Sequence, residues 1–134
     1  MLKADKLNTS AVTTMYWMFY KCGSLSDITA LANWNTKNVT NMEVMFEWCT
    51  NLNDITALAN WNVSNVTTML QMFYYCSNLT NVTTLANWNV SNVTNIGYMF
   101  YECTNLTTLD ISGWNTSKVS NADGFLGSCS KLIS

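Results

Sequence analysis

The stretch Leu52–Cys76 reads LNDITALANWNVSNVTTMLQMFYYC, and it decides the fold because the rest of the chain repeats it. Cysteines recur at a nearly constant interval, and tryptophans and Met-Phe pairs keep the same step. A period of this length is typical of stacked repeat arrays. The sequence therefore predicts a single solenoid of five repeats of 26–27 residues over residues 1–134. The repeated cysteines are Cys22, Cys49, Cys76, Cys103 and Cys129.

Each unit has two halves with different apolar spacing. In residues 66–76 the apolar positions fall on one face of a short helix. In residues 52–61 they step by three, which suits a short bent extended segment. Neither half can bury its apolar side alone, so the units must stack, with parallel strands about 4.8 Å apart. We expect one short parallel strand plus one short helix or helical turn per unit, with Asn side chains hydrogen-bonded along their columns.

Composition excludes several classes of function. The chain has a net charge of −2, only six basic residues and no His, although 49% of its residues are hydrophobic. Without His there is no Ser-His, Cys-His or His-metal chemistry, and the scattered lysines give no footprint for nucleic acid. No apolar run approaches the roughly 20 residues that span a bilayer, so we expect no membrane insertion. The first residues lack the apolar segment of a secretory signal, so we expect no signal peptide in this chain.

The remaining chemical groups predict no enzyme. Stacked cysteines have parallel Cβ vectors, which favours a buried column of reduced thiols over disulfides. A column of single cysteines also supplies no tetrahedral metal cluster. Asp27 and Asp54 occupy equivalent places and could hold Ca²⁺ weakly, but the next units carry Asn81 and Thr108 there. We expect no catalytic residues, no metal and no cofactor.

One motif resembles a known family. The string Trp-Asn-(Thr/Val)-Ser-Asn-Val-Thr-Asn-Met-x-x-Met-Phe-x-x-Cys-x-x-Leu is represented, with one difference in each, by Trp61–Leu79 (Thr68 for Asn), Trp88–Leu106 (Ile96 for Met) and Trp34–Leu52 (Lys37 for Ser). It resembles the BspA-like bacterial surface protein repeat, whose unit has nearly the same length, over essentially the whole chain. The resemblance implies a leucine-rich-repeat-like solenoid, an extracellular or cell-surface location, and a role in adhesion or partner binding. Two departures are the missing export signal and the missing long flanking or anchoring regions.

The positions around each Met-Phe pair differ most between units and are rich in aromatic residues. On the predicted helix these positions face away from the core, and exposed aromatic area is typical of interaction sites. The alternative is that the rings lie flat over the helix and seal the edge of the core. The candidate binding patch is Trp17, Tyr20, Trp48, Tyr74, Tyr75, Tyr98 and Tyr101.

The two ends of the chain share one register. The step from Cys129 through the end of one copy to Cys22 of another equals the step from Cys22 to Cys49, and neither end carries a distinct polar cap. Duplication of whole units, or excision from a longer protein, explains the same match. The candidate end-to-end interface is Met1, Ala4, Leu7, Val12, Phe125, Cys129 and Leu132.

Two functions follow as hypotheses. The first is a structural and interaction protein that stacks head-to-tail with itself into filaments. The alternative is an adhesion or binding module that recognises a host protein or glycan through the aromatic patch.

Overall fold

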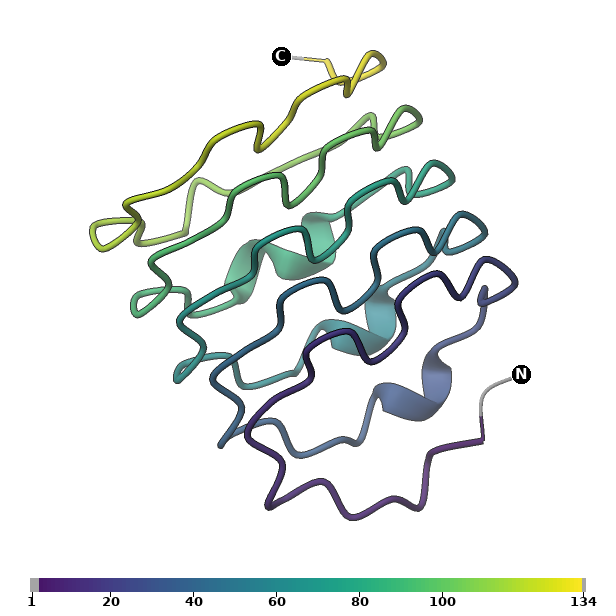
Figure 1. Cartoon of the computed structure of the whole chain (residues 1–134), viewed down its shortest axis with the longest axis vertical. Coiled ribbons are helices and arrows are strands. Elements are labelled where there is room, and N and C mark those ends of the chain that lie inside the picture. Colours follow the sequence, from purple (N-terminus) through teal and green to yellow (C-terminus); the bar gives the residue numbers. More distant parts are fainter. Residues whose placement is uncertain (1–2, 134) are drawn as a thin grey trace.

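The computed structural model describes residues 3–133, and its repeat units stack one above another along the long axis of the molecule (Figure 1). Each unit is one turn of a solenoid. A zigzag segment runs along one side, and a segment that includes a short helix in three of the units returns along the other. The predicted repeat fold is therefore the fold of the chain, but its units are built differently from the expectation.

The zigzag segments form the backbone ladder of the molecule. We call them turn ribbons; they comprise residues 14–22, 41–49, 68–76, 95–103 and 121–129. Isolated parallel β-bridges join the start of each ribbon to the start of the next, as between Thr68 and Asn95. Alternate N–H groups then donate to the following ribbon, for example from Phe73 to the carbonyl of Met99 at 2.9 Å. The others close turns on their own ribbon, so that Met72 donates to Met69 at 3.2 Å.

The helix predicted over residues 66–76 is wrong. Two residues of the third ribbon, Gln71 and Tyr75, have φ of 55° and 62°, which no right-handed helix accommodates. The ribbon nevertheless places Met69, Met72 and Phe73 inward, with nearly the spacing of a helical face. The left-handed residues recur four apart along every ribbon; they are Trp17, Lys21, Val44, Trp48, Gln71, Tyr75, Tyr98, Glu102, Gly124 and Ser128.

The strand predicted over residues 52–61 is also wrong. A 3₁₀-helix lies there instead, and three such helices follow one another along the array: η1 (Thr29–Leu31), η2 (Thr56–Leu58) and η3 (Thr83–Asn87). The Asp54 carboxylate accepts the N–H of Thr56 at 2.9 Å and so stabilises the turn that begins η2. Parallel pairing on this side is confined, within residues 3–133, to the bridge between Asn81 and Thr108.

The core consists of columns of identical residues. Phe19, Phe46, Phe73 and Phe100 stack with ring centroids 5.4, 5.4 and 5.6 Å apart. The Trp61 indole N–H donates 2.9 Å to the carbonyl of Leu31 in the preceding unit, which satisfies its one polar group.

Polar columns also join the units, through main-chain acceptors. The Asn65 amide donates to the main-chain carbonyl of Lys37 at 2.7 Å. The expected hydrogen bonds between stacked Asn side chains are therefore wrong, because the acceptor is the backbone of the preceding unit. The Thr67 N–H and hydroxyl both donate to the carbonyl of Thr40 in the preceding unit, at 2.9 and 3.2 Å.

Candidate functional site

Side chains along each turn ribbon alternate in pairs between the core and the outer surface. In the third ribbon Met72 and Phe73 are fully buried, whereas residues 70–71 and 74–75 lie on the outer side. We call the outer surface of the ribbons the aromatic face, because all six tyrosines and two tryptophans lie on it. These residues are Tyr16, Trp17, Tyr20, Trp48, Tyr74, Tyr75, Tyr98 and Tyr101.

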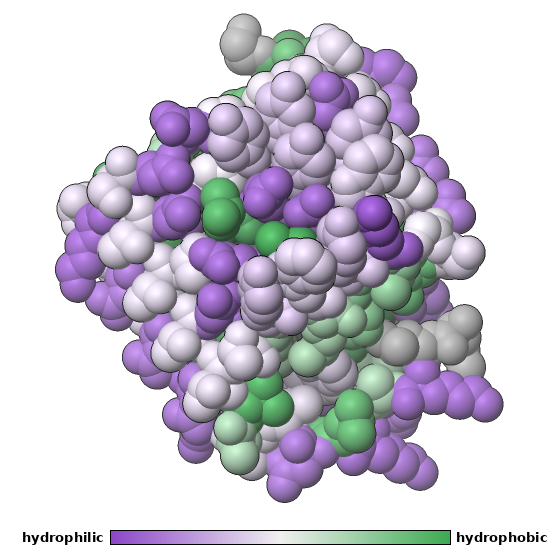
Figure 2. Space-filling model, viewed as in Figure 1, coloured by the Kyte–Doolittle hydropathy of each residue, from purple (hydrophilic) through white to green (hydrophobic). Residues whose placement is uncertain are grey.

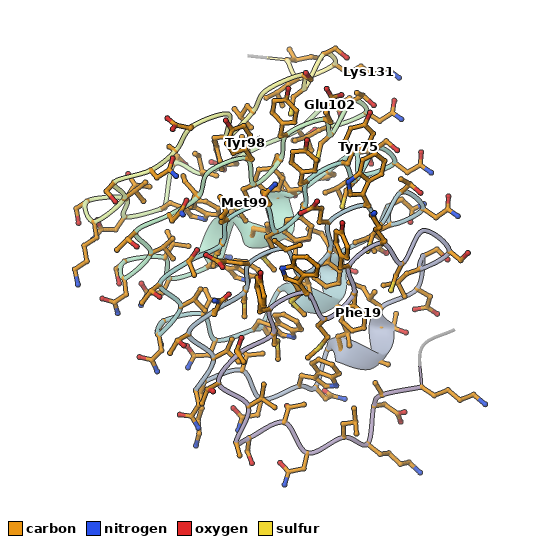
Figure 3. The ribbon with its side chains drawn as sticks, in the orientation of Figure 1. Phe19, Tyr75, Tyr98, Met99, Glu102 and Lys131 are labelled. Atoms are coloured by element: carbon orange, nitrogen blue, oxygen red, sulfur yellow. The ribbon has the colours of Figure 1, made fainter. Side chains whose placement is uncertain are left out.

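The figures show this face directly. In Figure 2 pale side chains of intermediate hydropathy gather over its middle and upper part, and hydrophilic residues line both margins. Figure 3 shows that Tyr75 and Tyr98, which belong to neighbouring ribbons, lie on the same side of the molecule. The solenoid thus presents its tyrosines from adjacent, regularly spaced segments.

Five of the rings form a continuous chain of contacts. Trp48 stacks on Tyr75 with centroids 3.9 Å apart and planes 11° apart. Tyr74 neighbours Tyr75 at 5.9 Å and stacks on Tyr101 at 5.3 Å, and Tyr101 meets Tyr98 edge-on at 5.5 Å. Such ring pairs stabilise one another by about 0.5–1.5 kcal/mol beyond their buried area.

A second cluster lies on the first ribbon. Trp17 is 4.6 Å from Tyr20 and 5.4 Å from Tyr16, measured between ring centroids. Tyr16 was missed from the sequence, although its side chain is 51% exposed. The helical interpretation gave no reason to place residue 16 on the same surface as residue 17. The ribbon does, because its side chains alternate in pairs and residues 16 and 17 form one outward pair.

Not every position around the Met-Phe pairs faces solvent. Val44 and Glu47 are only 6% and 9% exposed, so the expectation that these columns all face away from the core is wrong in the second unit. Burial raises the pKa of the Glu47 carboxyl, and the nearby positive charge of Lys21 partly opposes that shift.

The rings also cover the edge of the core. Tyr74, Tyr75 and Tyr101 are half-buried against one another, whereas Trp17 and Tyr98 remain 48% and 39% exposed. In the fifth ribbon, glycines make room for the rings of the fourth: a Cβ on Gly124 would approach the Tyr98 ring to 2.5 Å. Gly127 stands in the same relation to Tyr101, so both rings lie over the last ribbon.

Of the residues predicted at the two ends, Ala4 occupies the place in the repeat that Leu31 holds in the next unit. The carbonyl of Ala4 accepts the Trp34 indole N–H at 3.0 Å, as Leu31 does for Trp61. Ala4 is buried, and Leu7 is 62% exposed. Met1 lies outside the described residues. The other predicted end residues, which are half-buried, are Val12, Phe125, Cys129 and Leu132.

The backbone of the end ribbons is incompletely paired within residues 3–133. In the first ribbon, the carbonyls of Thr14, Tyr16 and Met18 accept no backbone N–H, although their equivalents in the second ribbon do. In the last ribbon, the N–H groups that would continue the ladder have no acceptor among the described residues. These donors are on Ala122, Gly124, Leu126 and Ser128.

The comparisons with known proteins identify a family without an assigned role. The family described as "Mycoplasma protein of unknown function, DUF285" matches residues 2–85 and residues 53–134. The chain belongs to the DUF285 family. Its structure is similar to a crystal structure of a leucine-rich repeat protein from Eubacterium ventriosum, at 20% identity and a TM-score of 0.43. That match covers 69% of the DUF285 chain and 28% of the other protein's length. No curated protein matches.

The thiols of this DUF285 chain are unpaired, and three of the five are buried. All five cysteines are free, and the buried Cys76 thiol donates to the carbonyl of Phe46 at 3.2 Å. Burial raises the pKa of the Cys49 thiol to about 12, which leaves almost no thiolate at neutral pH. Among residues 3–133, no three His, Cys, Asp or Glu side chains gather where they could hold a metal ion. The same residues include no helix long and apolar enough to cross a membrane.

Proposed function

We propose that this chain is a non-enzymatic binding module that adheres to a protein or glycan through its aromatic face. The observation that carries the proposal is the segregation of every tyrosine, together with Trp17 and Trp48, onto one side of the solenoid. Tyr and Trp are the residues that most often dominate binding energy at interfaces. The resemblance to BspA-like surface proteins supports an extracellular or cell-surface location for this binding.

The scaffold suits such a role because it holds the rings rigidly. Trp48, Tyr74, Tyr75 and Tyr101 are held by contacts with one another and by ribbons that are bonded to a neighbour on both sides, so little side-chain entropy is lost when a partner binds. Stacking buries one face of each ring in these pairs, so the contact that they offer a partner consists of ring edges, tyrosine hydroxyls and the ring faces that no neighbour covers.

Binding of the fluorescently labelled chain to cultured animal cells tests this function. Replacing the exposed rings, Trp17→Ala with Tyr98→Ala, should weaken binding at least about tenfold. The control is Ile133→Ala, which removes an 80% exposed apolar side chain outside the face. Protease or glycosidase treatment of the cells separates a protein from a glycan partner. A folded Trp17/Tyr98 variant that binds as well as the unmodified chain would contradict the proposal.

A second candidate function is head-to-tail stacking of copies. The N–H groups of the last ribbon and the carbonyls of the first that have no backbone partner among residues 3–133 are complementary, because one edge offers donors and the other offers acceptors. The step from Ala122 across to Thr14 of a second copy equals the step that joins Met69 to its acceptor Asn95. This equal step supports the proposal that a second copy continues the ladder.

Electron microscopy and sedimentation velocity test the stacking. Filaments should show an axial repeat of about 24 Å per copy, because five units lie about 4.8 Å apart. Leu7→Lys should abolish assembly, since it places a charge at the exposed end without disturbing a buried side chain. Asn60→Lys, which adds the same charge at an exposed position in the middle of the chain, should leave assembly intact. Monomers at every concentration would exclude the stacking.

A further inference from the structure

A hollow of about 360 Å³ interrupts the aromatic face between the first and second ribbons. It is lined by Tyr20, Lys21, Trp48 and Thr50. One face of the Trp48 indole is covered by Tyr75 of the third ribbon at 3.9 Å. The other face looks toward the first ribbon, where the equivalent position holds Lys21 rather than a ring. The Lys21 ammonium lies 5.2 Å from the centre of the Tyr20 ring, and the Trp48 side chain lines the hollow beside it.

The hollow forms between the first and second ribbons because two positions of the repeat carry different residues in the first unit than in the units that follow. Position 21 is lysine in the first unit and aromatic in the next two, Trp48 and Tyr75. Position 23 is glycine, whereas the other units have Thr or Ser in that column. A Cβ on Gly23 would lie 3.5 Å from the Thr50 hydroxyl oxygen, so a larger side chain there would fill the rim beside Thr50.

The lining favours a small ring that is apolar on one side and carries acceptors at its edge. The negative face of an indole attracts the weakly positive C–H groups of a pyranose ring. Lys21 and Thr50 supply donors at the rim, and pockets that fix orientation combine such an aromatic wall with a few polar groups. Among the four residues that line the hollow, Lys21 carries the charge, and the Glu47 carboxyl that interacts with it is buried and lines no part of the hollow.

We propose that this hollow is a subsite for a terminal acidic monosaccharide of a glycan, a sialic or uronic acid. The sugar ring packs on the free face of Trp48, its carboxylate pairs with the Lys21 ammonium, and a hydroxyl group bonds to Thr50. A charge-assisted bond of this kind is about twice as strong as a neutral one, which gives the acid preference over a neutral sugar. The inference rests on the proposed binding function and names the ligand class of one part of the face.

The test is an NMR titration of the isotope-labelled chain with three methyl glycosides. Those of N-acetylneuraminic acid and glucuronic acid should shift the Trp48 indole N–H, and at least one should bind about fivefold or more tighter than that of glucose. Lys21→Gln should remove the preference. Lys37→Gln, which removes the same charge at an exposed position lining no part of the hollow, should keep it. Gly23→Thr should weaken binding of all three.

Several outcomes overturn the subsite. They are equal affinity for acidic and neutral sugars, an acid preference that survives Lys21→Gln, or shifts confined to other residues. N-acetyl-tyrosine amide is the fourth probe: if it binds more tightly than the sugars, the hollow accepts a protein side chain instead. If the sugars fail while cell binding still depends on Trp17 and Tyr98, only the subsite fails. If sugars bind and cell binding ignores those rings, the proposed function of the wider face fails.

Discussion

At the scale of single residues, the unusual feature is the left-handed backbone at two positions of each ribbon. Only one of these ten positions is glycine, Gly124, although a left-handed conformation costs an ordinary residue about 1–2 kcal/mol. Val44 is the extreme case because its side chain is β-branched. The cost is offset by what the conformation allows: alternate N–H groups turn toward the next ribbon and bond there.

Introducing glycine at one left-handed position should stabilise the chain, and removing glycine from another should destabilise it. Ser128 has φ of 62° and an exposed side chain, so Ser128→Gly relieves strain with little packing lost. We expect a net gain of about 0.5–1 kcal/mol in unfolding free energy after the extra entropy of glycine in the unfolded chain. Gly124→Ala should destabilise by more, because its Cβ would also clash with Tyr98. Urea unfolding measures both, and changes of the same sign would refute the strain argument.

At the scale of elements, sequence periodicity identified the repeat but could not identify the ribbon. Val66, Met69, Met72, Phe73 and Cys76 are buried as expected. However, a helix and a ribbon of paired turns bury almost the same positions. They differ in the acceptors of the backbone N–H groups. In the ribbon these groups donate alternately to the carbonyl three residues back and to a carbonyl of the next unit, whereas in an α-helix they donate to the carbonyl four residues back. Apolar spacing carries no information about a partner in another unit.

The candidate site was predictable to a similar extent. Variation between units pointed to the aromatic columns, and the structure brings Trp48, Tyr74, Tyr75, Tyr98 and Tyr101 into one chain of contacts. The ring stacking, the exposure of Tyr16 and the hollow beside Trp48 depend on the two-in, two-out order of the ribbon. A helical interpretation could not supply that order, and it also left Glu47 on the surface, where the structure buries it.

At the scale of the whole molecule, each unit contacts only its neighbours, so stability is distributed along the array. An inner unit has a partner on both sides, and its columns are sealed: Phe73 is 0% exposed. In the last unit the equivalent position is Leu126, which is half-buried and packed from one side only. Truncating one side chain of a column should therefore lower the unfolding free energy more in the central units than in the end units.

Two truncations in that column measure this gradient. Phe73→Ala removes a ring stacked between Phe46 and Phe100 and should lower the unfolding free energy by about 3–5 kcal/mol. Leu126→Ala should cost only about 1–2 kcal/mol, because its side chain is incompletely buried in the folded chain. Urea unfolding gives both values, and hydrogen exchange should show Leu126→Ala loosening the last ribbon alone. Equal losses would mean that the chain unfolds as one body whose ends are packed as firmly as its centre. The end faces would then have less unsatisfied surface to offer to a second copy, and the aromatic face would be left as the main interaction surface.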